Sequence, residues 1–207
     1  ALTGGQAVME FSADGRKAGP GDVLYPETFY LDVVLPVVGA GGLQLKSWAS
    51  VAGGLTPVIR LSADNTYAGS TTVTQGILEL SGSLANGNIT IAPGALMRGG
   101  SGTIYFHLGV DQILNEGTLD LTNLTLVLLG PGTDPTYDIV VGGGQLLGDM
   151  FADVQVPQDW GDRWDIWREG SVITVKTPAG FAGEIPEPAT LLSLGLGAAA
   201  LLRRRRA

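Results

Sequence analysis

A dense group of carboxylates and aromatic rings lies in the last third of the chain. Carboxylates grouped in loops can bind Ca²⁺, and aromatic rings beside carboxylates can bind sugars. The spacing matches neither an EF-hand nor a nonapeptide Gly-Asp repeat, so we expect no metal site. The residues that could form a surface for extracellular polysaccharide are Trp160, Trp164, Trp167, Asp159 and Asp162, with Asp149, Asp153 and Asp165 nearby. In the other interpretation, the tryptophans pack as a cap while the aspartates face water.

His107 is the only histidine, so a site built from several histidines is excluded. A lone histidine can act as a general base, and its nearest carboxylate in the sequence is Asp111. No serine lies in the Gly-x-Ser-x-Gly context of a nucleophile elbow. We therefore expect a protein without catalytic residues or cofactors, which is not an enzyme. The alternative is a polysaccharide-binding or polysaccharide-degrading β-helix protein, which in the second case needs two suitably spaced carboxylates.

The composition is typical of a non-helical protein that works outside the cytoplasm. The 207 residues include 32 glycines, and charged residues make up only 15%. The glycines follow no three-residue period, so they indicate turns rather than a collagen helix. Cysteine is absent, which excludes disulfides, thiol chemistry and cysteine-zinc sites.

Charge is divided between the body of the chain and its C-terminal end. Arg203–Arg206 are four of the twelve basic residues, and Glu187 is the only acidic residue after residue 184. Residues 1–184 therefore hold eight basic and nineteen acidic residues, a net charge of −11. A body of that charge should repel phosphates, so we expect no nucleic-acid partner.

Short alternating segments separated by glycines run through the middle of the chain. Gly76–Leu80 and Gly117–Leu121 match closely and begin 41 residues apart. Alternation with a period of two predicts half-buried strands, with leucines on one face and Glu79 and Asp120 on the other. Because strands this short bury a core only when they stack, we expect an all-β solenoid whose last coil is closed by an irregular C-terminal cap. A β-sandwich, which would pair its strands as antiparallel hairpins, is the alternative.

A motif rich in glycine and threonine lies at the start of this region. Asn65-Thr66-Tyr67 is followed by Gly69, by Thr71-Thr72-Val73 and by Gly76–Leu80. This order, within residues 62–92, resembles the autotransporter-associated β-strand repeat, also called the passenger-associated transport repeat. Ser70 stands where that repeat usually has a second glycine. The resemblance implies a right-handed parallel β-helix of a secreted or surface protein.

The C-terminal end combines three parts in a fixed order. Pro186-Glu187-Pro188 precedes an uncharged stretch that ends at Leu202, and Arg203–Arg206 follow it. Counted from Ala189, the apolar stretch has 14 residues, about 21 Å as a helix, against about 30 Å of membrane hydrocarbon. Snorkelling arginines extend its reach. We expect one C-terminal transmembrane helix with the arginines on the cytoplasmic side and the body on the other side.

These three parts resemble the PEP-CTERM sorting signal of Gram-negative bacteria. The resemblance implies recognition by an exosortase-type membrane processing enzyme, cleavage near the Pro-Glu-Pro, and delivery to the cell surface or extracellular matrix. The protein would be anchored in the membrane only during export. The implied roles are a sorting motif (Pro186, Glu187, Pro188), a membrane anchor (Leu191, Leu192, Leu194, Leu196, Leu201, Leu202) and a cytoplasmic anchor (Arg203, Arg204, Arg205, Arg206).

The chain divides into five expected parts. They are β-rich N-terminal coils (1–61), the solenoid repeat region (62–130), terminal coils and cap (131–176), a linker with the Pro-Glu-Pro motif (177–188), and the transmembrane helix with its arginines (189–207). The opening Ala-Leu-Thr-Gly-Gly is typical of the middle of a domain. We expect residues 1–61 to belong to a longer chain that carries a signal peptide upstream.

Overall fold

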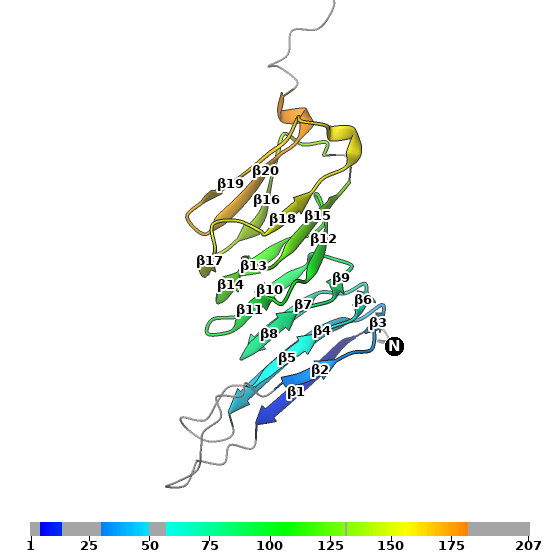
Figure 1. The fold of residues 1–207 in the computed structure, drawn as a ribbon, viewed down its shortest axis with the longest axis vertical. Coiled ribbons are helices and arrows are strands. Elements are labelled where there is room, and N and C mark those ends of the chain that lie inside the picture. The colour runs from blue at the N-terminus through cyan, green and yellow to red at the C-terminus, as the bar shows by residue number, and fades with distance from the viewer. Residues whose placement is uncertain (1–4, 14–29, 50–56, 131, 182–207) are drawn as a thin grey trace, which may run out of the picture.

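The computed structural model describes residues 5–13, 30–49, 57–130 and 132–181. These residues form three sheets that run side by side along one elongated stack (Figure 1). In order, the first sheet contains β1 (Gln6–Ala13), β4 (Gly42–Ala49), β7 (Thr71–Gln75), β10 (Ile89–Ile91), β13 (Ile113–Asn115), β16 (Thr136–Val141), β20 (Val172–Lys176) and β19 (Asp165–Glu169). The second contains β17 (Gln145–Leu147), β14 (Thr118–Asp120), β11 (Leu96–Gly99), β8 (Ile77–Leu80), β5 (Val58–Leu61) and β2 (Tyr30–Val33). The third contains β18 (Asp153–Gln155), β15 (Thr125–Leu129), β12 (Thr103–His107), β9 (Ser83–Leu84), β6 (Asp64–Tyr67) and β3 (Val38–Gly39).

The chain places one strand in each sheet before it returns to the first sheet, and we call each such circuit a coil. β1, β2 and β3 make the first coil, and β16, β17 and β18 make the sixth. Every strand pair between successive coils is parallel; β7 of the third coil, for example, pairs with β4 before it and β10 after it. This arrangement is mostly parallel β-sheet and is compatible with a β-helix. It differs from the β-sandwich alternative, which needs antiparallel hairpins throughout.

The core lies between the three sheets and is filled by alternate residues of each strand. Leu78, Leu80, Leu119 and Leu121 are all fully buried, as the alternation predicts. β8 and β14 both pair with β11, so the 41-residue spacing of the two matching segments spans two coils. Met97 of β11 lies between Leu78 and Leu119 in register, and the three side chains form one inward-facing row.

Glu79 lies on the outer face as predicted, but it is only 7% exposed. The reason is that arginines from the coils on both sides cover its carboxylate. Arg60 Nε lies 2.6 Å from Glu79 Oε1, and Arg98 Nη2 lies 2.7 Å from Glu79 Oε2. The ring of Tyr30 lies 4.0 Å from the Arg60 guanidinium carbon. Burial lowers the pKa of Arg60, but its hydrogen bond and charge interaction with Glu79 outweigh this effect and raise it.

Buried side chains of the Asn-Thr-Tyr motif form hydrogen bonds between neighbouring coils. Asn65 is 1% exposed, and its Oδ1 accepts from the Val37 amide of the preceding coil at 3.0 Å. Its Nδ2 donates to the Ser83 carbonyl of the next coil at 3.1 Å. Tyr67 is also buried, and its hydroxyl lies 2.5 Å from Thr71 Oγ1. These contacts explain the motif physically, while membership of the autotransporter-associated repeat stays a prediction.

The sixth coil is followed by an antiparallel hairpin at the upper end of the stack (Figure 1). β20 pairs antiparallel with β16 and with β19. Two short 3₁₀ helices flank the hairpin, η1 (Gln158–Trp160) and η2 (Pro178–Phe181). The part expected to hold the terminal coils and the irregular cap, residues 131–176, also contributes β17 and β18 to the parallel sheets.

The predicted transmembrane helix within residues 189–207 lies outside the described residues. Across the part of the chain that the structure describes, no helix is long and apolar enough to cross a membrane. The boundaries of the five expected parts stay predictions.

Gly76 occupies a turn that only glycine fits. Its φ is +82°, and an added Cβ would lie 2.2 Å from the Ser47 carbonyl oxygen. Gly94 has a similar φ of +79° but open space around it. We predict that Gly94→Ala lowers the free energy of unfolding by about 1–2 kcal/mol from backbone strain alone. Gly76→Ala should cost roughly 3 kcal/mol or more, because a backbone overlap is added. Chemical denaturation measures both, and equal losses would contradict the turn geometry.

Tyr67 makes stability depend on alkaline pH. Burial raises the pKa of its phenol to about 12, although the hydrogen bond with Thr71 opposes this. Because the folded pKa is above the unfolded value of about 10, the stabilisation is complete below pH 10 and is lost as the pH rises toward 12. The loss should reach roughly 3 kcal/mol. We predict that Tyr67→Phe flattens the unfolding free energy between pH 9 and 11.5; an unchanged slope would show that Tyr67 is not the titrating group.

Candidate functional site

The corner between the third and first sheets brings together the two residues that sequence analysis considered for acid–base chemistry. His107 ends β12, and Asp111 lies four residues later, just before β13. His107 Nδ1 is 3.0 Å from Asp111 Oδ2. Since a carboxylate only accepts, Nδ1 carries the proton in this contact. The imidazole is 46% exposed, whereas the Asp111 side chain is 2% exposed.

Asp111 accepts hydrogen bonds from other donors in addition to the His107 imidazole. Its Oδ2 also accepts from the His107 amide at 2.7 Å and from the Gly87 amide at 2.9 Å. Its Oδ1 accepts from Asn88 Nδ2 at 3.0 Å. Four donors from two coils therefore converge on one carboxylate, so both of its oxygens already accept hydrogen bonds from the protein. This arrangement is typical of a structural acceptor that joins neighbouring coils.

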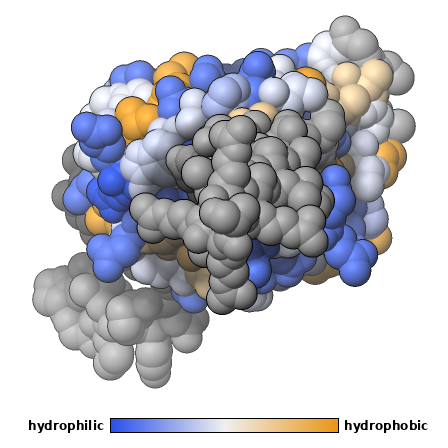
Figure 2. All heavy atoms as spheres, turned by 90° about the horizontal axis from the view of Figure 1, so that it is seen from above, coloured by the Kyte–Doolittle hydropathy of each residue, from blue (hydrophilic) through white to orange (hydrophobic). Residues whose placement is uncertain are grey.

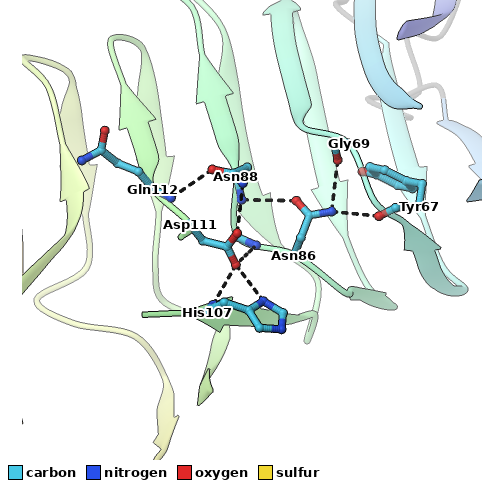
Figure 3. Close-up of polar contacts among 8 residues, drawn as sticks. Tyr67, Gly69, Asn86, Asn88, His107, Asp111 and Gln112 are labelled. Atoms are coloured by element: carbon cyan, nitrogen blue, oxygen red, sulfur yellow. Dashed lines mark hydrogen bonds and ion pairs between the residues drawn. The ribbon is translucent and has the colours of Figure 1, made fainter. Parts of the chain in front are cut away.

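Two asparagines extend this cluster to earlier coils, as Figure 3 shows. Asn88 Oδ1 accepts from the Gln112 amide at 3.2 Å. Asn86 Nδ2 donates to the carbonyls of Tyr67 and Gly69 at 2.8 and 3.0 Å. The polar row thus joins the second, third and fourth coils along one edge. Sequence analysis missed Asn86 and Asn88, although the Asn-Gly-Asn sequence of that turn was a possible signal.

A cavity of about 310 Å³ lies beside this corner. It is lined by Phe106, Gly109, Val110, Asp111, Gln112, Tyr137 and Asp138. Asp138 Oδ1 accepts from Thr174 Oγ1 at 2.7 Å, and the Tyr137 hydroxyl accepts from the Asp134 amide at 3.0 Å. The polar groups of the wall are therefore mostly bound to the protein itself. Within the described ranges, no group of three or more acidic or histidine side chains could hold a metal ion.

The tryptophans and aspartates of the predicted ligand surface differ in how exposed they are. Trp160 is 1% exposed and belongs to the core, so its ring cannot stack on a sugar. Trp164 is half-buried and packs against the same core. Trp167 on β19 is 37% exposed, and Asp159 and Asp162 are exposed. A sugar-binding surface in this region would rest on Trp164 and Trp167.

Arg168 connects the hairpin to the last coil. Its guanidinium donates from Nη1 to the Gly148 carbonyl at 2.7 Å and from Nη2 to the Leu146 carbonyl at 3.3 Å. These carbonyls lie in and just after β17, the last strand of the second sheet. Arg168 therefore occupies hydrogen-bonding positions that a further strand would use. Figure 2, which views this end of the stack, shows mostly hydrophilic residues around the rim.

The predicted sorting residues lie outside the described part of the chain. Pro186, Glu187, Pro188, the anchor leucines and Arg203–Arg206 all follow Phe181, the last described residue. Phe181 ends η2, which follows the capping hairpin. The sorting segment thus begins shortly after the capped end of the stack.

Comparison with known proteins identifies the C-terminal segment alone. Residues 184–206 match the PEP-CTERM protein-sorting motif. No curated protein matches the chain, and no solved structure does. The match covers the three-part tail predicted from the sequence.

Asp111 should matter for stability more than any other residue of the corner. Asp111→Asn replaces one carboxylate oxygen with an NH₂ group, which would face the hydrogen-bond donors that the oxygen now accepts from. It should therefore lower the free energy of unfolding by roughly 2–4 kcal/mol. His107→Ala removes one of four donors and should cost about 1 kcal/mol. Asp159→Asn, an exposed control, should stay within about 0.5 kcal/mol. A larger loss in His107→Ala than in Asp111→Asn, measured by urea denaturation, would argue for a different centre.

Proposed function

We propose that this protein is an exported, non-enzymatic protein of the cell surface or extracellular matrix. Its tail directs it to an exosortase-type enzyme in the membrane, which cleaves it near Pro186–Pro188. Membrane anchoring is then a transient stage of export. The stack of β-coils is the part that is delivered to the cell surface or extracellular matrix.

The PEP-CTERM motif at residues 184–206 is the observation that carries this proposal. The motif supports export and sorting by exosortase, and it implies membrane processing in Gram-negative bacteria. The body, with its net charge of −11, would lie on the side of the membrane opposite Arg203–Arg206. Pro186 and Pro188 disfavour helix around Glu187 and keep it extended for recognition.

The use of buried polar side chains supports a structural role for the body. Asp111 binds donors from two coils, Glu79 binds arginines from the coils on both sides, and Asn65 joins three coils. Each of these groups stabilises the stacking of coils. A catalytic carboxylate would instead keep an oxygen facing the substrate.

The position of the tail supports display with the capped end toward the membrane. β20 ends at Lys176, η2 ends at Phe181, and the matched motif starts at residue 184. Only a short connection therefore separates the membrane anchor from the hairpin. The first coil lies at the opposite end of the described stack (Figure 1), and in this proposal it points away from the membrane.

Glu187 offers a sharp test of recognition because Glu184 provides a matched control. We predict that Glu187→Gln reduces cleavage in an exosortase-containing host at least about tenfold, which corresponds to a recognition loss of about 1.4 kcal/mol. The uncleaved form should then accumulate in the membrane fraction on an immunoblot. Glu184→Gln, three residues upstream, should be cleaved normally. Normal release of the Glu187→Gln protein would contradict the proposed recognition.

A further inference from the structure

The capping hairpin extends the first sheet and gives it an outer face of mixed chemistry. Strands β19, β20 and β16 lie side by side near the upper end of the stack (Figure 1). Trp167 of β19 pairs with Thr174 of β20, and Thr174 pairs with Asp138 of β16. Residues directly opposite each other in antiparallel strands share a face. The three side chains therefore form one row across three strands, about 10 Å long.

Trp167 faces solvent within this row. Ile166 beside it packs against the core, and Val175, the partner of Ile166, is fully buried, so the alternation turns Trp167 outward. Trp167 is 37% exposed. Among the described residues, no group accepts a hydrogen bond from its indole N–H. An exposed indole offers a broad apolar face with a polar edge, which is suited to stacking on a sugar ring.

The cavity of about 310 Å³ continues the row at its other end, because Asp138 also lines the cavity. Thr174 donates to Asp138 Oδ1, whereas Asp138 Oδ2 has no hydrogen-bond partner among the described residues. Gln112, another lining residue, uses only its backbone amide in the polar row. Figure 3 shows its carboxamide pointing away from Asn88 and Asp111. An aromatic platform, free polar groups and a cavity are the components of a small-molecule site.

The charge of this face limits which ligands it can take. Asp165 and Glu169 lie two residues to either side of Trp167 on β19, so all three side chains share a face. Asp138 adds a third carboxylate, and Lys176 lies opposite Asp165 and offsets one charge. An acidic polysaccharide would be repelled by this face. The hydroxyls of a neutral sugar can donate to the carboxylate oxygens.

We propose that this face binds a neutral polysaccharide of β-linked glucose or N-acetylglucosamine. In these sugars the ring substituents are equatorial and the ring hydrogens axial, so each ring has an apolar face and a hydroxyl-bearing edge. The apolar face stacks on Trp167, and the edge donates a hydrogen bond to Asp138 Oδ2. The next sugar enters the cavity, where the Gln112 carboxamide can both donate and accept. Ligand binding of this kind goes beyond export and surface display.

Calorimetry on the full-length protein tests the ligand class. The protein is purified in a zwitterionic detergent, because a glycoside detergent would compete for the site. Cellohexaose or chitohexaose should bind with a Kd of about 1 mM or tighter, and a hexamer of galacturonic acid at least about tenfold more weakly. Because the proposed ligand is uncharged, about 0.5 M NaCl should change its Kd by no more than about twofold.

Tyr105 provides a matched control for the aromatic platform. It is also 37% exposed, but it lies on β12 in the third sheet. Trp167→Ala should weaken binding of the neutral hexamer at least about tenfold, whereas Trp167→Phe should retain most of the affinity because it keeps a ring. Tyr105→Ala should bind as the unchanged protein does. Urea denaturation of each variant checks that the fold is intact.

Failure of both neutral hexamers to bind the unchanged protein would overturn the proposal. An affinity that Trp167→Ala leaves unaltered, or that Tyr105→Ala lowers equally, would also overturn it. Equal binding of the galacturonic acid hexamer, or loss of binding in salt, would contradict the neutral ligand. These measurements use purified protein, so none of their outcomes depends on export or cleavage.

Discussion

The parallel pairing of successive coils is the constraint on which the rest of this structure depends. The strands are short; β8 has four residues and β10 has three. No such strand is stable alone, so each coil needs a neighbour to satisfy its backbone and cover its apolar side chains. Close coil contact also fixes the turns, which is why Gly76 cannot carry a Cβ beside the Ser47 carbonyl. Each coil is thus stabilised mainly by its contacts with the neighbouring coils.

Buried polar side chains act as links within this arrangement. Asn65, Glu79 and Asp111 differ in chemistry, but each binds groups from a neighbouring coil. A buried polar group is costly unless its hydrogen bonds are complete, so these links also specify the register between coils. At the capped end of the stack, Arg168 completes hydrogen bonds of β17 in the same way.

Features that depend on the local sequence pattern, such as buried strands, were predicted from the sequence. Contacts between residues of different coils were not. The alternation around Leu78 and Leu119 identified buried strands, and the 41-residue spacing followed from two coils. The three-part tail was identified from its order of proline, apolar and arginine residues and was confirmed by the motif match. The burial of Glu79 was missed, because Arg60 and Arg98 come from other coils. Asp111 was noticed only as a neighbour of His107, since Gly87 and Asn88 approach it across more than twenty residues.

The proposed function connects the body with the tail. The PEP-CTERM motif of the tail supports export and sorting, and in the proposal the stack of coils is the exported body, whose polar groups bind one another. The most direct test is the intact mass of the protein recovered from the surface or medium of an exosortase-containing Gram-negative cell. The account predicts a chain that ends near Pro186–Pro188 and lacks residues 189–207. Surface protein that retains Arg203–Arg206 would contradict it.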